Sequence, residues 1–137
     1  MKLFLRYWLP VLAYMALIFY LSSRSGFGVT VPSWLLFWDK FVHACIYGFL
    51  TLLCIRALSQ GRWREAHSQV LVLSVLIASA YGITDEFHQS FVPMRSPSAS
   101  DWVADTAGAI LVAMGIYFRN TWETTSPGRE TMVERED

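Results

Sequence analysis

Four apolar blocks alternate with polar segments along the chain, at residues 3–21, 41–58, 70–84 and 102–118. A bilayer core is roughly 30 Å thick and is crossed by about 20 helical residues. None of the blocks is an unbroken apolar run of that length, so each helix is expected to include some polar neighbours. The pattern predicts an all-α, polytopic membrane protein built as a bundle of four transmembrane helices.

The composition agrees with this prediction. The 137 residues are 54% hydrophobic, and the excess over the roughly half found in a soluble domain lies in the four blocks. The first block follows a basic start and also has the pattern of a signal peptide. However, Leu21 stands where cleavage after Ser23 would need a small residue. We therefore expect an uncleaved first span.

The basic residues are distributed unequally between the two sides of such a bundle. Three lie on the side of the turns that follow the first and third helices, and these are Arg24, Lys40 and Arg95. Eight lie on the other side, and these are Lys2, Arg6, Arg56, Arg62, Arg64, Arg119, Arg129 and Arg135. Because Lys and Arg mark the cytoplasmic side, both termini are predicted to be cytoplasmic. We expect one domain over residues 1–119 and a disordered, charged cytoplasmic tail over residues 120–137.

Polar residues on three of the helices lie at matching depth. At about 1.5 Å per residue, they fall about 20–30 Å above the basic inner ends of their helices. They form pairs four residues apart, which share a helix face. The pairs are Asp39 with His43, Asp85 with Gln89, and Asp101 with Asp105. A charge at the centre of a membrane helix costs roughly 2.5–3.5 kcal/mol, so these side chains are predicted to line one outward-facing polar pocket.

Small residues lie just beneath this polar layer, again four apart. The pairs are Ala44/Gly48, Ala78/Gly82 and Ala104/Gly108. Such pairs allow membrane helices to approach closely. The second, third and fourth helices are therefore expected to converge below the pocket.

Several of these residues also have a purely structural interpretation. Asp39 and Lys40 could form an ion pair at a helix start. His43 could be a hydrogen-bonded buried histidine, a proton carrier or a metal ligand. Asp101 could complete a capping box with Ser98 as N-cap. Asp105 lies a full turn inside the helix, so it needs a neutralising partner. Arg95 is the best candidate, and His43 lies at the same depth as Asp105.

Three further residues are assigned no part in the pocket. His88 is expected at the membrane interface. Cys45 and Cys54 are nine residues apart on one predicted helix, which puts them on opposite faces. They are therefore predicted to be unable to bridge to each other.

Four segments carry a resemblance to a known family: "FYLSS", "DKFVHACIYGFL", "YGITDEFHQSFVPMRSPSASD" and "DWVADTAGAILV". Together they resemble the VanZ-like family of small bacterial membrane proteins over residues 15–118. The family pattern falls on Asp39, Lys40, His43, Tyr47, Tyr81, Gly82, Asp85, Glu86, Gln89, Phe91, Pro93, Arg95, Asp101, Asp105 and Gly108. The chain differs at two positions, with Met94 where the family often has Gly and Asp105 where it often has Asn.

The resemblance implies a multi-pass protein of the bacterial cytoplasmic membrane, and the family's namesake is associated with teicoplanin resistance. The expected partners are membrane lipids, a lipid-linked envelope precursor or a lipoglycopeptide, and no nucleic acid. The expected pocket residues are Asp39, Lys40, His43, Tyr47, Asp85, Glu86, Gln89, Arg95, Asp101 and Asp105. A divalent cation could be held by Asp85, Glu86, Asp101 and Asp105.

Three functions remain open from the sequence. The first is an enzyme acting on envelope lipids, with Asp85, Glu86, His43 and Asp105 as candidate catalytic groups. The chain lacks the G-x-S-x-G and H-E-x-x-H motifs. The second is a non-catalytic protein that binds a headgroup or docks a partner. The third is a small proton-coupled carrier, which is disfavoured because the inner halves of the helices offer few polar groups.

Overall fold

The chain folds into four helices, and the prediction of an all-α protein is confirmed. The computed structural model describes residues 2–24, 33–62 and 66–125, without the side chains of residues 33–37, 124 and 125. The helices are α1 (Lys2–Ser22), α2 (Ser33–Leu58), α3 (Ser68–Gln89) and α4 (Ala99–Thr125). Each is long and apolar enough to cross a membrane. The predicted disordered tail falls mainly on residues 126–137, outside the described ranges.

Two helices are longer than their apolar blocks. α2 begins at Ser33, before the block at residues 41–58, and α4 continues to Thr125, past the boundary predicted at residue 119. The last described turns of α4 are polar, and the Thr121 hydroxyl donates a hydrogen bond to the carbonyl of Tyr117, 3.1 Å away. Hydropathy marks where lipid ends, and a helix can continue beyond that point into water.

The surface is apolar and part of the interior is polar, which is the reverse of a soluble protein. Leu111 on α4 is 67% exposed, whereas Asp105 on the same helix is 1% exposed. Asp85, Glu86 and Asp101 are also buried. Large exposed apolar side chains over all four helices suit contact with lipid, where ionisable groups face the protein interior. The chain is thus a multi-pass membrane protein.

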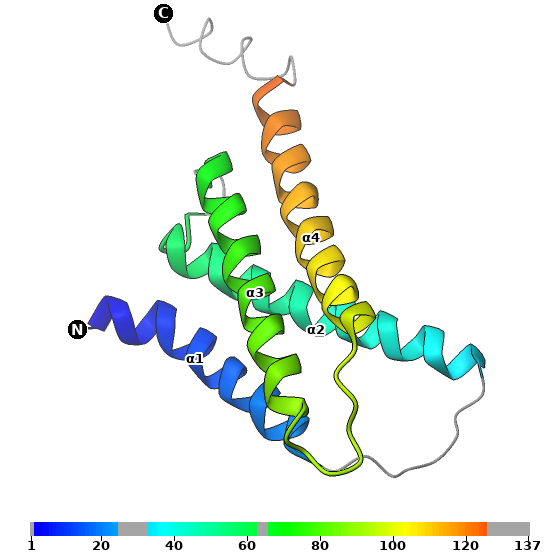
Figure 1. Cartoon of the computed structure of the whole chain (residues 1–137). Coiled ribbons are helices and arrows are strands. Elements are labelled where there is room, and N and C mark those ends of the chain that lie inside the picture. The colour runs from blue at the N-terminus through cyan, green and yellow to red at the C-terminus, as the bar shows by residue number, and fades with distance from the viewer. Residues whose placement is uncertain (1, 25–32, 63–65, 126–137) are drawn as a thin grey trace, which may run out of the picture.

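α2 is the central helix. It packs against each of the other three, and its contact with α4 is the most extensive. Figure 1 shows α2 crossing behind α3 and α4, which run side by side in opposite chain directions. The C-terminal end of α1 and that of α3 lie at the loop end of the bundle, where the 90–98 loop joins α3 to α4 (Figure 1). The N-terminal half of α2 lies against that of α4, where Lys40 contacts Asp101 and His43 contacts Asp105.

Glycines allow the helices to converge beneath the polar layer, as the small-residue pairs predict. A Cβ atom on Gly108 of α4 would overlap the backbone carbonyl of Ala44 on α2, so the two backbones are in direct contact. A Cβ on Gly48 would lie 3.3 Å from the Gly108 carbonyl oxygen, and one on Gly82 of α3 would lie 3.3 Å from Asp105 Oδ2. α2 and α4 therefore approach to a distance that is possible only because the residue at position 108 is glycine.

We predict that Gly108→Ala lowers the free energy of unfolding by about 1–3 kcal/mol or more, because the added methyl group must push two backbones apart. Gly115→Ala is the matched control on the same helix, since a Cβ there meets nothing within 4 Å. Thermal unfolding of both variants in detergent checks this. Equal stability of the two variants would contradict the backbone contact.

Candidate functional site

A cavity of about 250 Å³ lies between α1, α2 and α3 at the loop end of the bundle. Its polar lining comes from α1, α2, α3 and the 90–98 loop, and includes Ser22, Asp39, His43, Tyr47, Asp85, Gln89 and Arg95. Its apolar lining comes mainly from α1, through Leu17, Ile18 and Leu21, with Val42 and Ile46 from α2. The cavity is therefore amphipathic, with a polar and an aliphatic wall.

Asp85 is the most deeply buried acid of this lining, at 4% exposed. Its Oδ2 atom accepts hydrogen bonds from the Ser22 hydroxyl at 2.7 Å and from Gln89 Nε2 at 3.1 Å. Its Oδ1 atom has no hydrogen-bond partner, and neither does the hydroxyl of Tyr47, which is 1% exposed. No basic side chain of the described residues forms an ion pair with Asp85. All of its donors are neutral.

A second group of charges joins α2 to α4. His43 Nδ1 lies 2.9 Å from Asp105 Oδ1, and His43 Nε2 lies 3.9 Å from Asp101 Oδ2. The Lys40 ammonium contacts the carboxylate of Asp101 and lies 3.2 Å from Asp39 Oδ2. Asp39 and His43, which are four residues apart on α2, therefore lie next to Asp101 and Asp105, which are four residues apart on α4. His43 reaches from this network to the cavity, which it lines.

Arg95 does not neutralise Asp105, so this expectation was wrong. Arg95 is exposed, and its Nε donates to the backbone carbonyl of Arg24, 3.4 Å away. His43 takes the place next to Asp105 because it lies at the same depth on the neighbouring helix. A neutral imidazole donates its Nδ1–H to the carboxylate, and a protonated imidazole also balances its charge.

Glu86 points away from the cavity, as the 100° step from Asp85 implies. Its Oε2 accepts the backbone N–H of Ser98 at 2.6 Å, while Oε1 has no partner. The capping box is absent, because the Ser98 N–H that Asp101 would accept is bound by Glu86 and Asp101 is bound by Lys40. Ser98 does precede the first residue of α4. Glu86 therefore fixes the start of α4 from the neighbouring helix.

The predicted carboxylate set for a divalent cation is split between three places. Asp85 faces α1, Glu86 faces the start of α4, and Asp101 and Asp105 face α2. Among the described residues, the one group of three with ligating atoms within 4.8 Å of one another is Asp39, His43 and Asp101. The Lys40 ammonium already contacts both of its carboxylates, and so supplies the positive charge there.

The sequence reasoning missed the contribution of α1. Ser22 is buried and binds Asp85, and the next residue, Ser23, places its hydroxyl 2.9 Å from His88 Nε2. His88, expected at the interface, is half-buried and stacks on Phe19 with ring centroids 4.1 Å apart. A signal was available, because Ser22 continues the buried face of Val11 and Ile18 at helical spacing.

Met94 shows why its position is often glycine. Its φ angle is +63°, in the left-handed region that costs a residue with a side chain roughly 1–2 kcal/mol. The Met94 side chain itself is exposed. The turn therefore keeps a glycine-like conformation in this chain, directly before Arg95.

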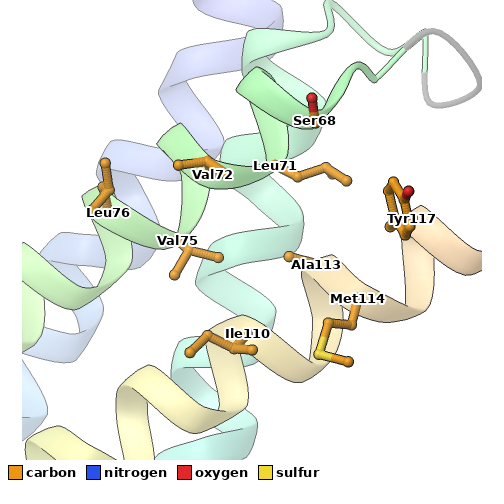
Figure 2. Close-up of a pocket in the computed structure, with 9 residues that line it drawn as sticks. All are labelled: Ser68, Leu71, Val72, Val75, Leu76, Ile110, Ala113, Met114 and Tyr117. Atoms are coloured by element: carbon orange, nitrogen blue, oxygen red, sulfur yellow. The ribbon is translucent and has the colours of Figure 1, made fainter.

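A second, larger groove of about 310 Å³ separates α3 from α4 beyond their point of contact. Figure 2 shows its aliphatic lining, including Val75 of α3 and Ile110 and Met114 of α4, with Ser68 and Tyr117 toward one end. It holds no titratable group apart from that tyrosine. Neither free cysteine lies in its lining. The polar cavity is the candidate site.

We predict that His43 and Asp105 are energetically coupled and that Arg95 and Asp105 are not. In a double-mutant cycle with His43→Gln and Asp105→Asn, the interaction energy should be about 0.5–3 kcal/mol, because the two side chains are in contact. The matched cycle with Arg95→Ala and Asp105→Asn should give a value near zero. Both interaction energies are measured by unfolding in detergent. A larger interaction energy for Arg95 with Asp105 than for His43 with Asp105 would refute the geometry described.

The chain matches the VanZ/LLP1 family over residues 7–120, a range that includes every residue of the cavity and of the charge network. No curated protein and no solved structure matches it. The match covers most of the chain and confirms the resemblance seen in its motifs. The chain therefore belongs to the VanZ/LLP1 family.

Proposed function

We propose that the polar cavity binds the headgroup of an amphipathic molecule of the cell envelope, either a membrane lipid or lipid-linked material. The observation that carries this proposal is the two-sided lining. Asp85, Gln89 and Tyr47 offer polar contacts to a headgroup, while Leu17 and Ile18 of α1 offer an aliphatic wall to the carbons next to it. A fully polar, water-soluble ligand would leave the aliphatic wall without an apolar group to contact.

The size of the cavity favours a headgroup over a whole antibiotic. Pockets for drug-sized ligands measure roughly 300–1,000 Å³, and this cavity measures about 250 Å³. A lipoglycopeptide would exceed it many times over and could place only one substituent inside. On this proposal, an effect on teicoplanin susceptibility would arise through the envelope lipid that the protein binds.

Catalysis is a second candidate, and the contact of His43 with Asp105 favours it. A buried carboxylate at Nδ1 fixes the imidazole tautomer, and Nε2, which lies 3.9 Å from Asp101 Oδ2, can then accept a proton. His43 lines the cavity, so it could act as a general base toward a bound headgroup. The carrier function gains no such support, because the buried hydroxyls of Thr51 and Ser74 are bonded to carbonyls of their own helices.

We predict that Val42→Trp abolishes most binding of envelope lipid, because the indole fills the cavity. Val42 lines the cavity and is 49% exposed, so the larger side chain should be tolerated. Native mass spectrometry of the purified protein with added lipid measures the bound fraction. Val103→Trp is the matched control, since Val103 is 58% exposed on α4 and outside the cavity. Undiminished binding by Val42→Trp would refute the proposal.

We also predict that the cavity faces outward, because eight basic residues lie on the other side. Ser96→Cys in the 90–98 loop should react with a membrane-impermeant thiol reagent in intact cells, and Gln69→Cys in the first turn of α3 should not. Both positions are exposed. The unsubstituted chain, with Cys45 and Cys54, gives the background. Labelling at position 69 alone would show that the protein has the opposite orientation in the membrane.

A further inference from the structure

We propose that the headgroup bound in the cavity is zwitterionic, with a primary ammonium group that binds Asp85 and a phosphate that binds Arg95. An aminophospholipid has this chemistry. The inference rests on the proposed function and adds the class of ligand to it. It begins with the one acid of the cavity that lacks a cation.

Among the described residues, Asp85 and Glu86 are the acids of the polar layer without a basic partner, and only Asp85 lines the cavity. Asp39 and Asp101 contact the Lys40 ammonium, and Asp105 contacts His43. Glu86 accepts a backbone N–H at the start of α4, where the helix dipole favours a negative charge. Asp85 has only the neutral donors Ser22 and Gln89 on Oδ2 and no partner on Oδ1.

A buried carboxylate without a cation is costly in a membrane protein, and an unfilled acceptor adds to that cost. Asp85 is 96% buried and lines the cavity, so a ligand there can supply both a charge and a donor. A primary ammonium provides three N–H donors on a compact cation. A trimethylammonium group has no N–H and would leave Oδ1 unfilled. The unpartnered hydroxyl of Tyr47 lies in the same lining and can accept a second N–H.

Arg95 supplies the opposite charge to the same cavity. It forms no ion pair with any carboxylate in the ranges that the structure describes, and only its Nε has a hydrogen-bond partner there. The remaining guanidinium N–H groups suit two oxygens of a phosphate. Arg95 is exposed and Asp85 is buried, so the ammonium would lie deep in the cavity and the phosphate near its mouth.

The test measures the affinity of the whole chain in detergent for three phospholipids with identical acyl chains. Native mass spectrometry should show that phosphatidylethanolamine binds roughly tenfold more tightly than phosphatidylcholine or phosphatidylglycerol, as expected for one charge-assisted hydrogen bond. Asp85→Asn should remove this preference and leave binding at the phosphatidylglycerol level. Arg95→Ala should weaken the binding of all three.

Glu123→Gln is the control for net charge, because it removes one negative charge from an exposed residue near the C-terminal end of α4, outside the cavity. It should keep the preference for phosphatidylethanolamine. Soluble glycerophosphoethanolamine distinguishes a free headgroup from an intact lipid as the ligand. If it competes with phosphatidylethanolamine, the free headgroup is sufficient for binding. If it does not compete, the acyl chains are required. Either result supports the ammonium contact if the tenfold preference is present.

Three results would overturn the inference. They are equal binding of the three lipids by the unsubstituted chain, an unchanged preference in folded Asp85→Asn, and loss of the preference in Glu123→Gln. The first needs no variant, so the inference stays testable if Asp85→Asn does not fold. Equal binding that Val42→Trp abolishes would leave the proposed function intact, whereas lipid binding that Val42→Trp leaves undiminished would refute both.

Discussion

The contact between the backbones of Gly108 and Ala44 is the constraint on which the polar layer depends. It brings α2 and α4 so close that side chains within two turns of it face each other across the interface. Lys40 then meets Asp101, and His43 meets Asp105. A wider spacing would separate these pairs and leave several charges without partners in a low-dielectric interior, where an unpaired charge is expensive. Close packing and charge compensation are therefore one requirement in this bundle.

The polar layer divides into two parts with different chemistry. Between α2 and α4, acids and bases contact each other, and the network is complete within the protein. Between α1 and α3, Asp85 is held by a hydroxyl and an amide, which position it without balancing its charge. A structural role accounts for the first part. The second part has unused hydrogen-bonding capacity, as expected of a binding site. His43 belongs to the charge network of the first part and also lines the cavity.

The sequence predicted the helices and the polar layer because both follow from periodic constraints. Apolar length fixes a span, and depth together with a shared face placed Asp39 and His43 opposite Asp101 and Asp105. It did not predict the partners made by loops and helix ends. Arg95 has a long side chain on an irregular turn, so its direction depends on backbone angles such as that of Met94, which no periodicity encodes. Ser22 was missed because a serine at the end of an apolar helix is common, and its partner lies on another helix.

The left-handed backbone of Met94 has a consequence for how the bundle assembles. A methionine disfavours this conformation, so the turn between α3 and α4 is not preformed by its own sequence. Its shape must be imposed by the helices once they have docked, with Glu86 holding the Ser98 N–H at one end and Arg95 bonded to the Arg24 carbonyl near the other. The turn therefore adds little to the stability of an α3–α4 hairpin taken alone, and its conformation depends on the contacts that the packed bundle makes with it.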